Sequence, residues 1–194
     1  MEKIPLHPNP NYELEQYLTP SDLASEIIWT AFLRGDVKNK VVVDLGCGTG
    51  RLCAGISLLG GYCICVDIDY ESLKVAKEFF ENENIIAEFV NADVNNLEIR
   101  ADTVIQNPPF GVVRKGADLI FLDKALSIAK TVYSIHKSNP ETLQLITKLA
   151  TSKGFQVEYL THKFRMKAYY PWHRKKIHEF LIDIYLFTKP FNRQ

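Results

Sequence analysis

The stretch VVVDLGCGTG, residues 41–50, decides the fold. Residues 41–46 form a short apolar run that contains Asp44, which is typical of a buried strand in a parallel sheet. Glycines stand at alternate positions from the end of this run, at Gly46, Gly48 and Gly50, and residues 51–59 have the pattern of a helix. Glycine lets a backbone approach a ligand closely. A tight turn with nothing bound is the alternative, but the strand, loop and helix context favours a ligand site.

Strands and helices alternate outward from this stretch. An extended, Pro-rich arm covers residues 1–15, and a helix capped by Thr19 runs to about Arg34. The pattern predicts strands at 41–46, 62–69, 87–93, 101–107 and 131–136, helices at 51–59, 70–82, 117–130 and 140–153, and an edge hairpin at 155–164 and 180–187. This is a doubly wound α/β sheet with helices on both faces, whose ligands bind beyond the carboxyl ends of the strands.

Bulk composition sets the class of protein. The 194 residues predict one domain, made of an arm and helix (1–35), a cofactor and catalytic half (36–137) and a substrate-side half (138–194). The 23 basic and 23 acidic residues cancel, which disfavours a globally basic nucleic-acid binder. No run approaches the roughly 18 apolar residues of a membrane span. The N-terminus lacks a signal core, so we expect a cytoplasmic or nuclear protein.

The four cysteines, Cys47, Cys53, Cys63 and Cys65, form no CxxC pair. This spacing disfavours a structural zinc site, and no metal is expected. Buried free thiols are the preferred interpretation.

Acidic residues at successive strand ends indicate the cofactor. A dinucleotide site would need a glycine at position 51, where this sequence has Arg51. Asp44 would also repel a pyrophosphate. S-adenosylmethionine carries an ammonium and a sulfonium and no phosphate, so it suits this loop. Asp67 is placed to accept the ribose hydroxyls, and Asp93 to accept the adenine amine. Ile68 and Val94 are placed to sandwich the adenine.

The motif Asn107-Pro108-Pro109-Phe110 follows the fourth predicted strand. Two prolines also simply terminate a strand. With a methyl donor nearby, the rigid turn instead aims two acceptors, the Asn107 amide oxygen and the Pro108 carbonyl, at the hydrogens of a weakly nucleophilic NH₂ group. Phe110 offers a face on which a planar substrate stacks. These four residues are the candidate catalytic group.

A segment without acids, 161–178, interleaves cations with aromatics, which suits single-stranded or splayed bases. A solvated hairpin loop is the alternative. His136 and Lys137 end the fifth strand, where they either meet phosphate or simply end the strand at the surface. The candidate RNA-binding residues are Arg114, Lys115, His136, Lys137, Lys163, Arg165, Lys167, Trp172, Arg174, Lys175 and Lys176.

The strand order and the glycine loop resemble the class I S-adenosylmethionine-dependent methyltransferases, whose Rossmann-like sheet has seven strands with the last one antiparallel. Further stretches resemble the methyltransferase-like protein five family, which methylates adenine N6 in small-subunit ribosomal RNA: EQYLTP (15–20), DLGCGTG (44–50), VDID (66–69), DTVIQNPPFG (102–111) and VYSIHK (132–137).

This resemblance implies the catalytic role of residues 107–110 and a partner, a small zinc-binding activator protein that adds a strand to the sheet edge. Gln106 departs from the pattern, because an apolar residue is usual there. The expected cofactor contacts are Gln16, Tyr17, Thr19, Asp44, Gly46, Cys47, Gly48, Thr49, Arg51, Asp67, Ile68, Asp93, Val94 and Asn107.

Other functions share parts of this chemistry. A protein glutamine N5 methyltransferase uses the same amide clamp, and the basic-aromatic segment favours RNA over it. A DNA adenine-N6 enzyme ranks third, because so short a chain has no added target-recognition region. A nicotinamide oxidoreductase or a non-catalytic nucleotide-binding module conflicts with Arg51 and with the Asn-Pro-Pro-Phe motif.

Overall fold

The computed structural model describes residues 2–167 and 177–190, and their side chains except those of 164–167 and 177–178. Seven strands form one sheet in the order β3-β2-β1-β4-β5-β7-β6. β7 is antiparallel to β5 and to β6, and the other neighbouring pairs are parallel. The strands are β1 (Val41–Leu45), β2 (Tyr62–Asp67), β3 (Glu88–Asn91), β4 (Thr103–Gln106), β5 (Thr131–Lys137), β6 (Gln156–Lys167) and β7 (Ile177–Thr188).

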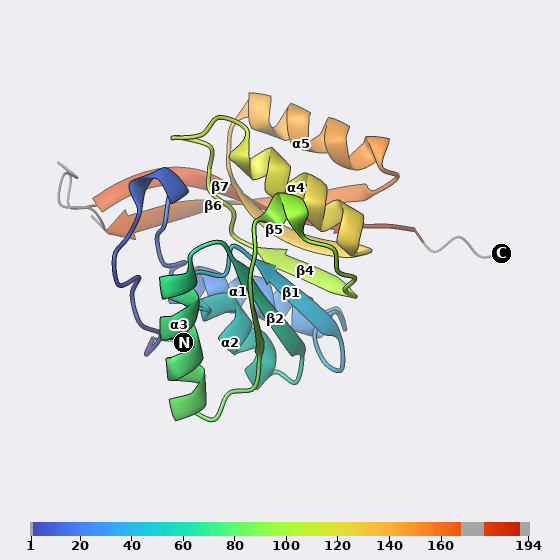
Figure 1. Cartoon of the computed structure of the whole chain (residues 1–194). Helices are drawn as coiled ribbons and strands as arrows, with labels where there is room; N and C mark the ends of the chain where they lie inside the picture. Colours follow the sequence, from blue (N-terminus) through green and yellow to red (C-terminus); the bar gives the residue numbers. More distant parts are fainter. Residues whose placement is uncertain (1, 168–176, 191–194) are drawn as a thin grey trace.

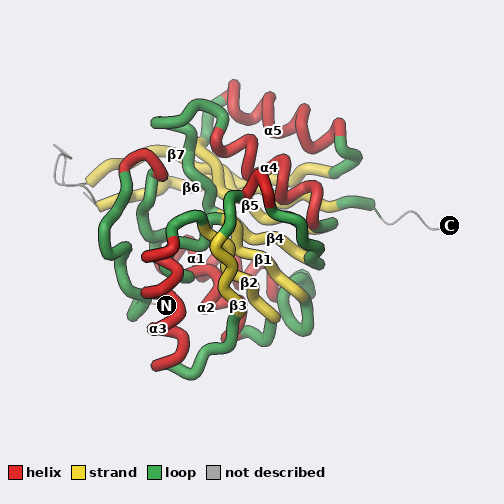
Figure 2. Tube along the Cα trace, viewed as in Figure 1, coloured by secondary structure: helices red, strands yellow, loops and turns green. Residues whose placement is uncertain are grey.

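Helices cover both faces of the sheet (Figure 1). The helices are α1 (Ser21–Leu33), α2 (Arg51–Leu58), α3 (Tyr70–Asn82), α4 (Ala117–Ile128) and α5 (Pro140–Ser152), with 3₁₀ turns η1 (Tyr12–Leu14) and η2 (Val94–Asn96). Figure 2 shows α4 and α5 on one side of the strands and α1, α2 and α3 on the other. The mostly parallel, doubly wound sheet with helices on both faces, expected from the sequence, is confirmed.

The apolar side chains of the strands pack into two hydrophobic cores, one on each face of the sheet. In β1, Val42 packs into the core under α1 and α2, whereas Val43 and Leu45 pack into the core under α4 and α5. Successive strand residues point to opposite faces, so a strand buried on both faces must be apolar throughout. This explains why VVVDL carries only one polar side chain.

The topology places a crevice between β1 and β4. The chain proceeds from β1 outward to β2 and β3, then returns to place β4 on the other side of β1. The strand order reverses there, and ligands of open α/β sheets bind at such a point. Asp44 pairs with Ile105 in the register of β1 and β4, so the glycine loop and the Asn-Pro-Pro-Phe motif leave the sheet side by side.

Two local predictions are wrong. Thr19 does not cap α1, because the N-cap residue is Pro20 and no side chain caps it. The Thr19 hydroxyl accepts a hydrogen bond from Asn107 instead. The expected free thiols are found only at Cys47 and Cys65, since Cys53 on α2 and Cys63 on β2 form a disulfide. These two cysteines are ten positions apart in the sequence, and periodicity alone gave no sign of their contact.

The disulfide leads to a direct prediction. Alkylation of the unfolded chain without a reductant should label two cysteines, and prior reduction should raise this to four, read by intact mass. Reduction should also lower the free energy of unfolding by about 2–3 kcal/mol, because the unfolded chain regains the entropy of a short closed loop. Four labelled cysteines in both samples would show that the bond does not form in solution.

Candidate active site

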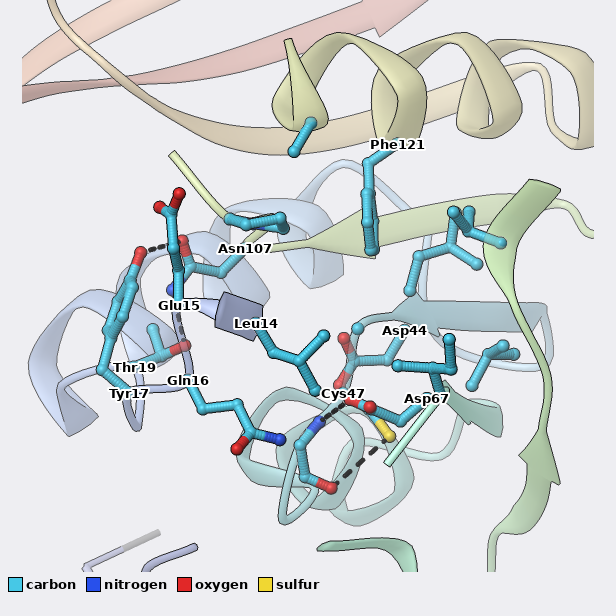
Figure 3. A pocket seen from close by; sticks show the side chains of 18 of the residues that line it. Leu14, Glu15, Gln16, Tyr17, Thr19, Asp44, Cys47, Asp67, Asn107 and Phe121 are labelled. Carbon is cyan, nitrogen blue, oxygen red and sulfur yellow. Dashed lines mark hydrogen bonds between the residues drawn. The ribbon is translucent and has the colours of Figure 1, made fainter. Parts of the chain in front are cut away.

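A cavity opens at the carboxyl ends of β1, β2 and β4 (Figure 3). The glycine loop forms its floor, residues 13–19 form one wall, and α4 closes another side. Thirteen of the fourteen expected cofactor contacts line it: Gln16, Tyr17, Thr19, Asp44, Gly46, Cys47, Gly48, Arg51, Asp67, Ile68, Asp93, Val94 and Asn107.

The N-terminal arm, which in the structure extends over residues 2–20 up to the start of α1, is fastened over the glycine loop. The fully buried Thr49 does not line the cavity, and its hydroxyl donates to the Pro5 carbonyl at 2.6 Å. Thr49 therefore anchors the arm, and its expected contact with the cofactor stays a prediction. Arg51, the first residue of α2, donates from its guanidinium to the Thr19 carbonyl at 2.6 Å and fixes the other end of the arm.

Asp44 is a buried carboxyl at the base of the cavity. Its Oδ2 accepts the Cys53 backbone N–H at 3.2 Å. Within the described residues, its buried Oδ1 has no hydrogen-bond partner. Burial, together with the nearby charge of Asp67, raises the pKa of Asp44 to about 8. An unpartnered buried oxygen of this kind calls for a donor, and a ligand ammonium supplies one.

Asp67 ends β2 and organises the loop beside it. Its Oδ2 accepts the Gly48 N–H at 2.7 Å, and its Oδ1 accepts the Asp69 N–H at 2.9 Å. Burial raises the pKa of Asp67. Each carboxylate oxygen has a second lone pair, so both keep the capacity to accept a ligand hydroxyl.

The expected adenine end of the cavity is apolar. Ile68 is 52% exposed and Val94 is nearly buried, and both line the cavity with Asp93. At Gly46 the backbone φ is +72°, and an added Cβ would lie 3.0 Å from the Phe121 ring. Glycine is required at position 46 both because φ is positive and because a Cβ would crowd the Phe121 ring. The loop can therefore lie close to the cavity.

Asn107 directly follows β4 and lies beside Tyr17 and Thr19 of the arm (Figure 3). Its Nδ2 donates to the Thr19 hydroxyl at 2.9 Å, and its Oδ1 accepts the Tyr17 hydroxyl at 3.3 Å. Thr19 and Tyr17 thus fix the orientation of the Asn107 amide, and Asn107 lines the cavity. Pro109 also lines the cavity. Phe110 packs edge-on against Phe180, with 5.8 Å between ring centroids.

The expected phosphate contact of His136 is wrong. His136 is fully buried, so RNA phosphate does not reach it. Its Nε2 lies 2.7 Å from the Ser134 hydroxyl, which accepts the Gln106 amide at 2.9 Å. Its Nδ1 lies 3.5 Å from Asp118 of α4. Gln106, unusual for its position in the motif, thus has a polar partner inside the sheet.

Of the other expected RNA-binding residues, some are exposed in the structure and the rest lie partly or wholly outside the described residues. Arg114 lines the cavity mouth and is exposed, as are Lys115, Lys137 and Lys163. For Arg165 and Lys167 the structure describes only the backbone of β6, so their side chains lie outside the described residues. Trp172, Arg174, Lys175 and Lys176 lie outside them altogether.

Several residues that line the cavity were not predicted from the sequence, among them His7, Leu14 and Phe121. His7 is buried, its Nδ1 lies 2.8 Å from the Ser72 hydroxyl, and burial lowers the pKa of His7 to about 4. An added Cβ at Gly48 would lie 2.7 Å from the His7 ring. No local pattern predicts that an arm residue packs on a loop about forty positions later.

Comparison with known proteins gives the family. The methyltransferase small domain model matches residues 19–152. An rRNA N(6)-adenosine-methyltransferase METTL5 from Danio rerio is 36% identical over 92% of this chain and 90% of its own length. The chain belongs to the methyltransferase small domain family and, within it, to the METTL5 family. The METTL5 protein of Drosophila melanogaster is 32% identical over 92% of this chain and 88% of its own.

Solved structures agree with this placement in the METTL5 family. A Pyrococcus horikoshii protein, provisionally described as an RNA methyltransferase, is 42% identical with a TM-score of 0.91, and the match covers 100% of this chain and 94% of that chain. The predicted fold class, S-adenosylmethionine dependence and family are confirmed. Among the described residues, no helix has both the length and the apolar character needed to cross a bilayer.

Proposed function

We propose that the protein transfers a methyl group from S-adenosylmethionine to N6 of an adenine in small-subunit ribosomal RNA. The observation that carries this proposal is the Asn107 amide, which Thr19 and Tyr17 hold in one orientation and which lines the same cavity as the glycine loop. The named METTL5 relatives act on rRNA adenosine N6, which supports the same substrate here.

The residues of the cavity fit the cofactor. Bound there, S-adenosylmethionine supplies an electrophilic methyl on a cationic sulfur. The unpartnered Oδ1 of Asp44 suits its ammonium, and Asp67 suits its ribose hydroxyls. We place its adenine between Ile68 and Val94, with Asp93 as the acceptor for the amine.

The protein's part in the reaction is alignment. An aromatic amine is a poor nucleophile, because its lone pair is delocalised into the ring. The Asn107 oxygen and the Pro108 carbonyl accept its two hydrogens, so the lone pair turns toward the methyl donor. Phe110 holds the ring by stacking. No strong base is needed, because the proton leaves after the methyl group has been transferred.

Asp44 makes cofactor binding depend on pH. In the free protein its pKa of about 8 keeps the carboxyl neutral near pH 7. A bound ammonium favours the carboxylate, so binding releases a proton and the affinity rises with pH. Calorimetry should show up to about tenfold tighter binding per unit between about pH 6 and 7.5, levelling near pH 8. In Asp44→Asn this slope should vanish, and an unchanged slope would contradict the assignment.

We place the RNA on four exposed cations, of which Arg114 lines the cavity: Arg114, Lys115, Lys137 and Lys163. A target adenine must be unpaired or flipped to reach Asn107. We also propose the partner expected from the sequence, a small zinc-binding activator protein that extends the sheet. The described sheet ends in β3 and β6, and β6 exposes Tyr159 and Leu160. A cytoplasmic or nuclear location fits this substrate.

The competing function is methylation of a protein glutamine. A Methanocaldococcus jannaschii relative whose name carries that activity is 35% identical, but over only 39% of this chain. Labelled S-adenosylmethionine should be offered with ribosomal RNA and, separately, with a release factor. Label in RNA alone supports the proposal, whereas label in protein alone would overturn it.

A further inference from the structure

Residues 15–19 of the arm cross the catalytic motif in contact with it. Glu15 accepts the Val113 backbone N–H at 2.7 Å, in the loop that follows Phe110. Two residues on, the Tyr17 hydroxyl donates to the Asn107 oxygen at 3.3 Å, and Thr19 accepts from the same amide at 2.9 Å. The arm therefore holds both atoms of the Asn107 side-chain amide.

Tyr17 makes two contacts that the proposed function assigns to the substrate. Its ring centroid lies 5.5 Å from that of Phe110, with an angle of 44° between the planes. Its hydroxyl donates to the Asn107 oxygen, the atom that must accept a hydrogen of the target amine. A flat ring with one polar hydrogen thus lies against Phe110 and Asn107, as a flipped adenine would. Figure 3 shows the Tyr17 side chain reaching Asn107 from the arm.

We propose that Tyr17 is a gate residue: it holds the place of the target base in the free protein and swings out when the base enters. This inference rests on the proposed function. It adds that the Tyr17 side chain competes with the target base for the substrate site. The O–H donor of Tyr17 is exchanged for the N6–H donor of adenine at one acceptor, and one ring contact with Phe110 is exchanged for another.

The surroundings of Tyr17 restrict the motion to its side chain. On one side, Gln16 donates to the Asp69 carboxylate at 2.7 Å. On the other, Thr19 is held through its carbonyl by Arg51 at 2.6 Å. The backbone is thus fastened on both sides of Tyr17, and Tyr17 itself is only half-buried. Rotation about its side-chain bonds opens the site without releasing the arm from the cofactor cavity.

The Tyr17→Phe variant tests the gate, because it keeps the ring and removes only the donor that competes for Asn107. A neutral hydrogen bond contributes about 0.5–1.5 kcal/mol, so kcat/KM for protein-free ribosomal RNA should rise about two- to tenfold. Tyr62→Phe is the matched control, because Tyr62 is 67% exposed at the amino end of β2, whereas the cavity lies at the carboxyl ends of the strands. An unchanged or lower kcat/KM in Tyr17→Phe would overturn the gate.

A second measurement follows the side chain itself. The protein is labelled with 3-fluorotyrosine, and the Tyr17 signal is assigned by its absence in Tyr17→Phe. With S-adenosylhomocysteine present, a short RNA that contains adenosine should shift this ¹⁹F signal, whereas a uridine-only RNA of equal length should not. Equal shifts with both RNAs, or none, would overturn the proposal.

The proposed function and the Tyr17 gate are tested by different measurements. The proposed function is judged by transfer of label from the wild-type protein to RNA, and its failure removes the gate as well. The gate alone is judged by the direction of change in Tyr17→Phe and by the ¹⁹F signal. Wild-type activity on RNA together with lower activity in Tyr17→Phe would keep the function and make Tyr17 a residue that positions Asn107.

Discussion

Asn107→Ala should lose about 10²- to 10³-fold in kcat while binding S-adenosylmethionine nearly as tightly as the wild type. The reason is that the amide oxygen is one of two acceptors that align the reacting amine, and removal of one preorganised catalytic hydrogen-bonding group typically costs this much. Single-turnover methyl transfer with saturating cofactor measures the rate, and calorimetry measures the affinity.

Asn82→Ala is the matched control for Asn107, because Asn82 is exposed at the end of α3 and does not line the cavity. Its rate and affinity should both equal those of the wild type. A large loss of cofactor affinity in Asn107→Ala would assign Asn107 to cofactor binding rather than to the clamp. A rate close to that of the wild type would remove it from the mechanism.

Asp67→Ala should weaken cofactor binding by about 100-fold or more. Hydrogen bonds to a charged group contribute about 1.5–3 kcal/mol each, and the variant removes an acceptor for two ribose hydroxyls. It also releases the Gly48 N–H that the carboxylate now holds at 2.7 Å, which loosens the loop under the cofactor. Equilibrium titration with S-adenosylmethionine measures the loss.

Asp102→Ala separates this role from the general effect of removing an aspartate. Asp102 is exposed just before β4, at the amino ends of the strands and opposite the cavity, where it accepts the Val41 N–H at 2.9 Å. Its removal should leave the affinity for the cofactor unchanged. If Asp67→Ala instead changed only the rate at saturating cofactor, the ribose assignment would be wrong.

The parts of the site that follow strands were predictable from sequence. Asp44, Asp67 and Asn107 each stand where an apolar run meets a loop, and the carboxyl ends of parallel strands meet at one edge of a sheet. Strand periodicity and the glycine loop thus located these three side chains without any knowledge of tertiary contacts. The edge hairpin was predictable for a related reason, since its two strands alternate within short windows.

The parts that depend on long-range packing were not predictable. The path of the arm is set by Pro5, His7 and Gln16 meeting residues 44 to 65 positions away. No period in the sequence encodes such contacts. His136 shows the same limit, because its place at a strand end indicated solvent, whereas its burial against Ser134 and beside Asp118 comes from α4 covering the sheet.

The most direct test of the account is to identify the methylated nucleoside. Ribosomal RNA incubated with the protein and methyl-deuterated S-adenosylmethionine is digested to nucleosides and analysed by mass spectrometry. The account predicts deuterated N6-methyladenosine, absent when Asn107→Ala replaces the wild type. Label on any other nucleoside, or the same yield of N6-methyladenosine from both proteins, would contradict it.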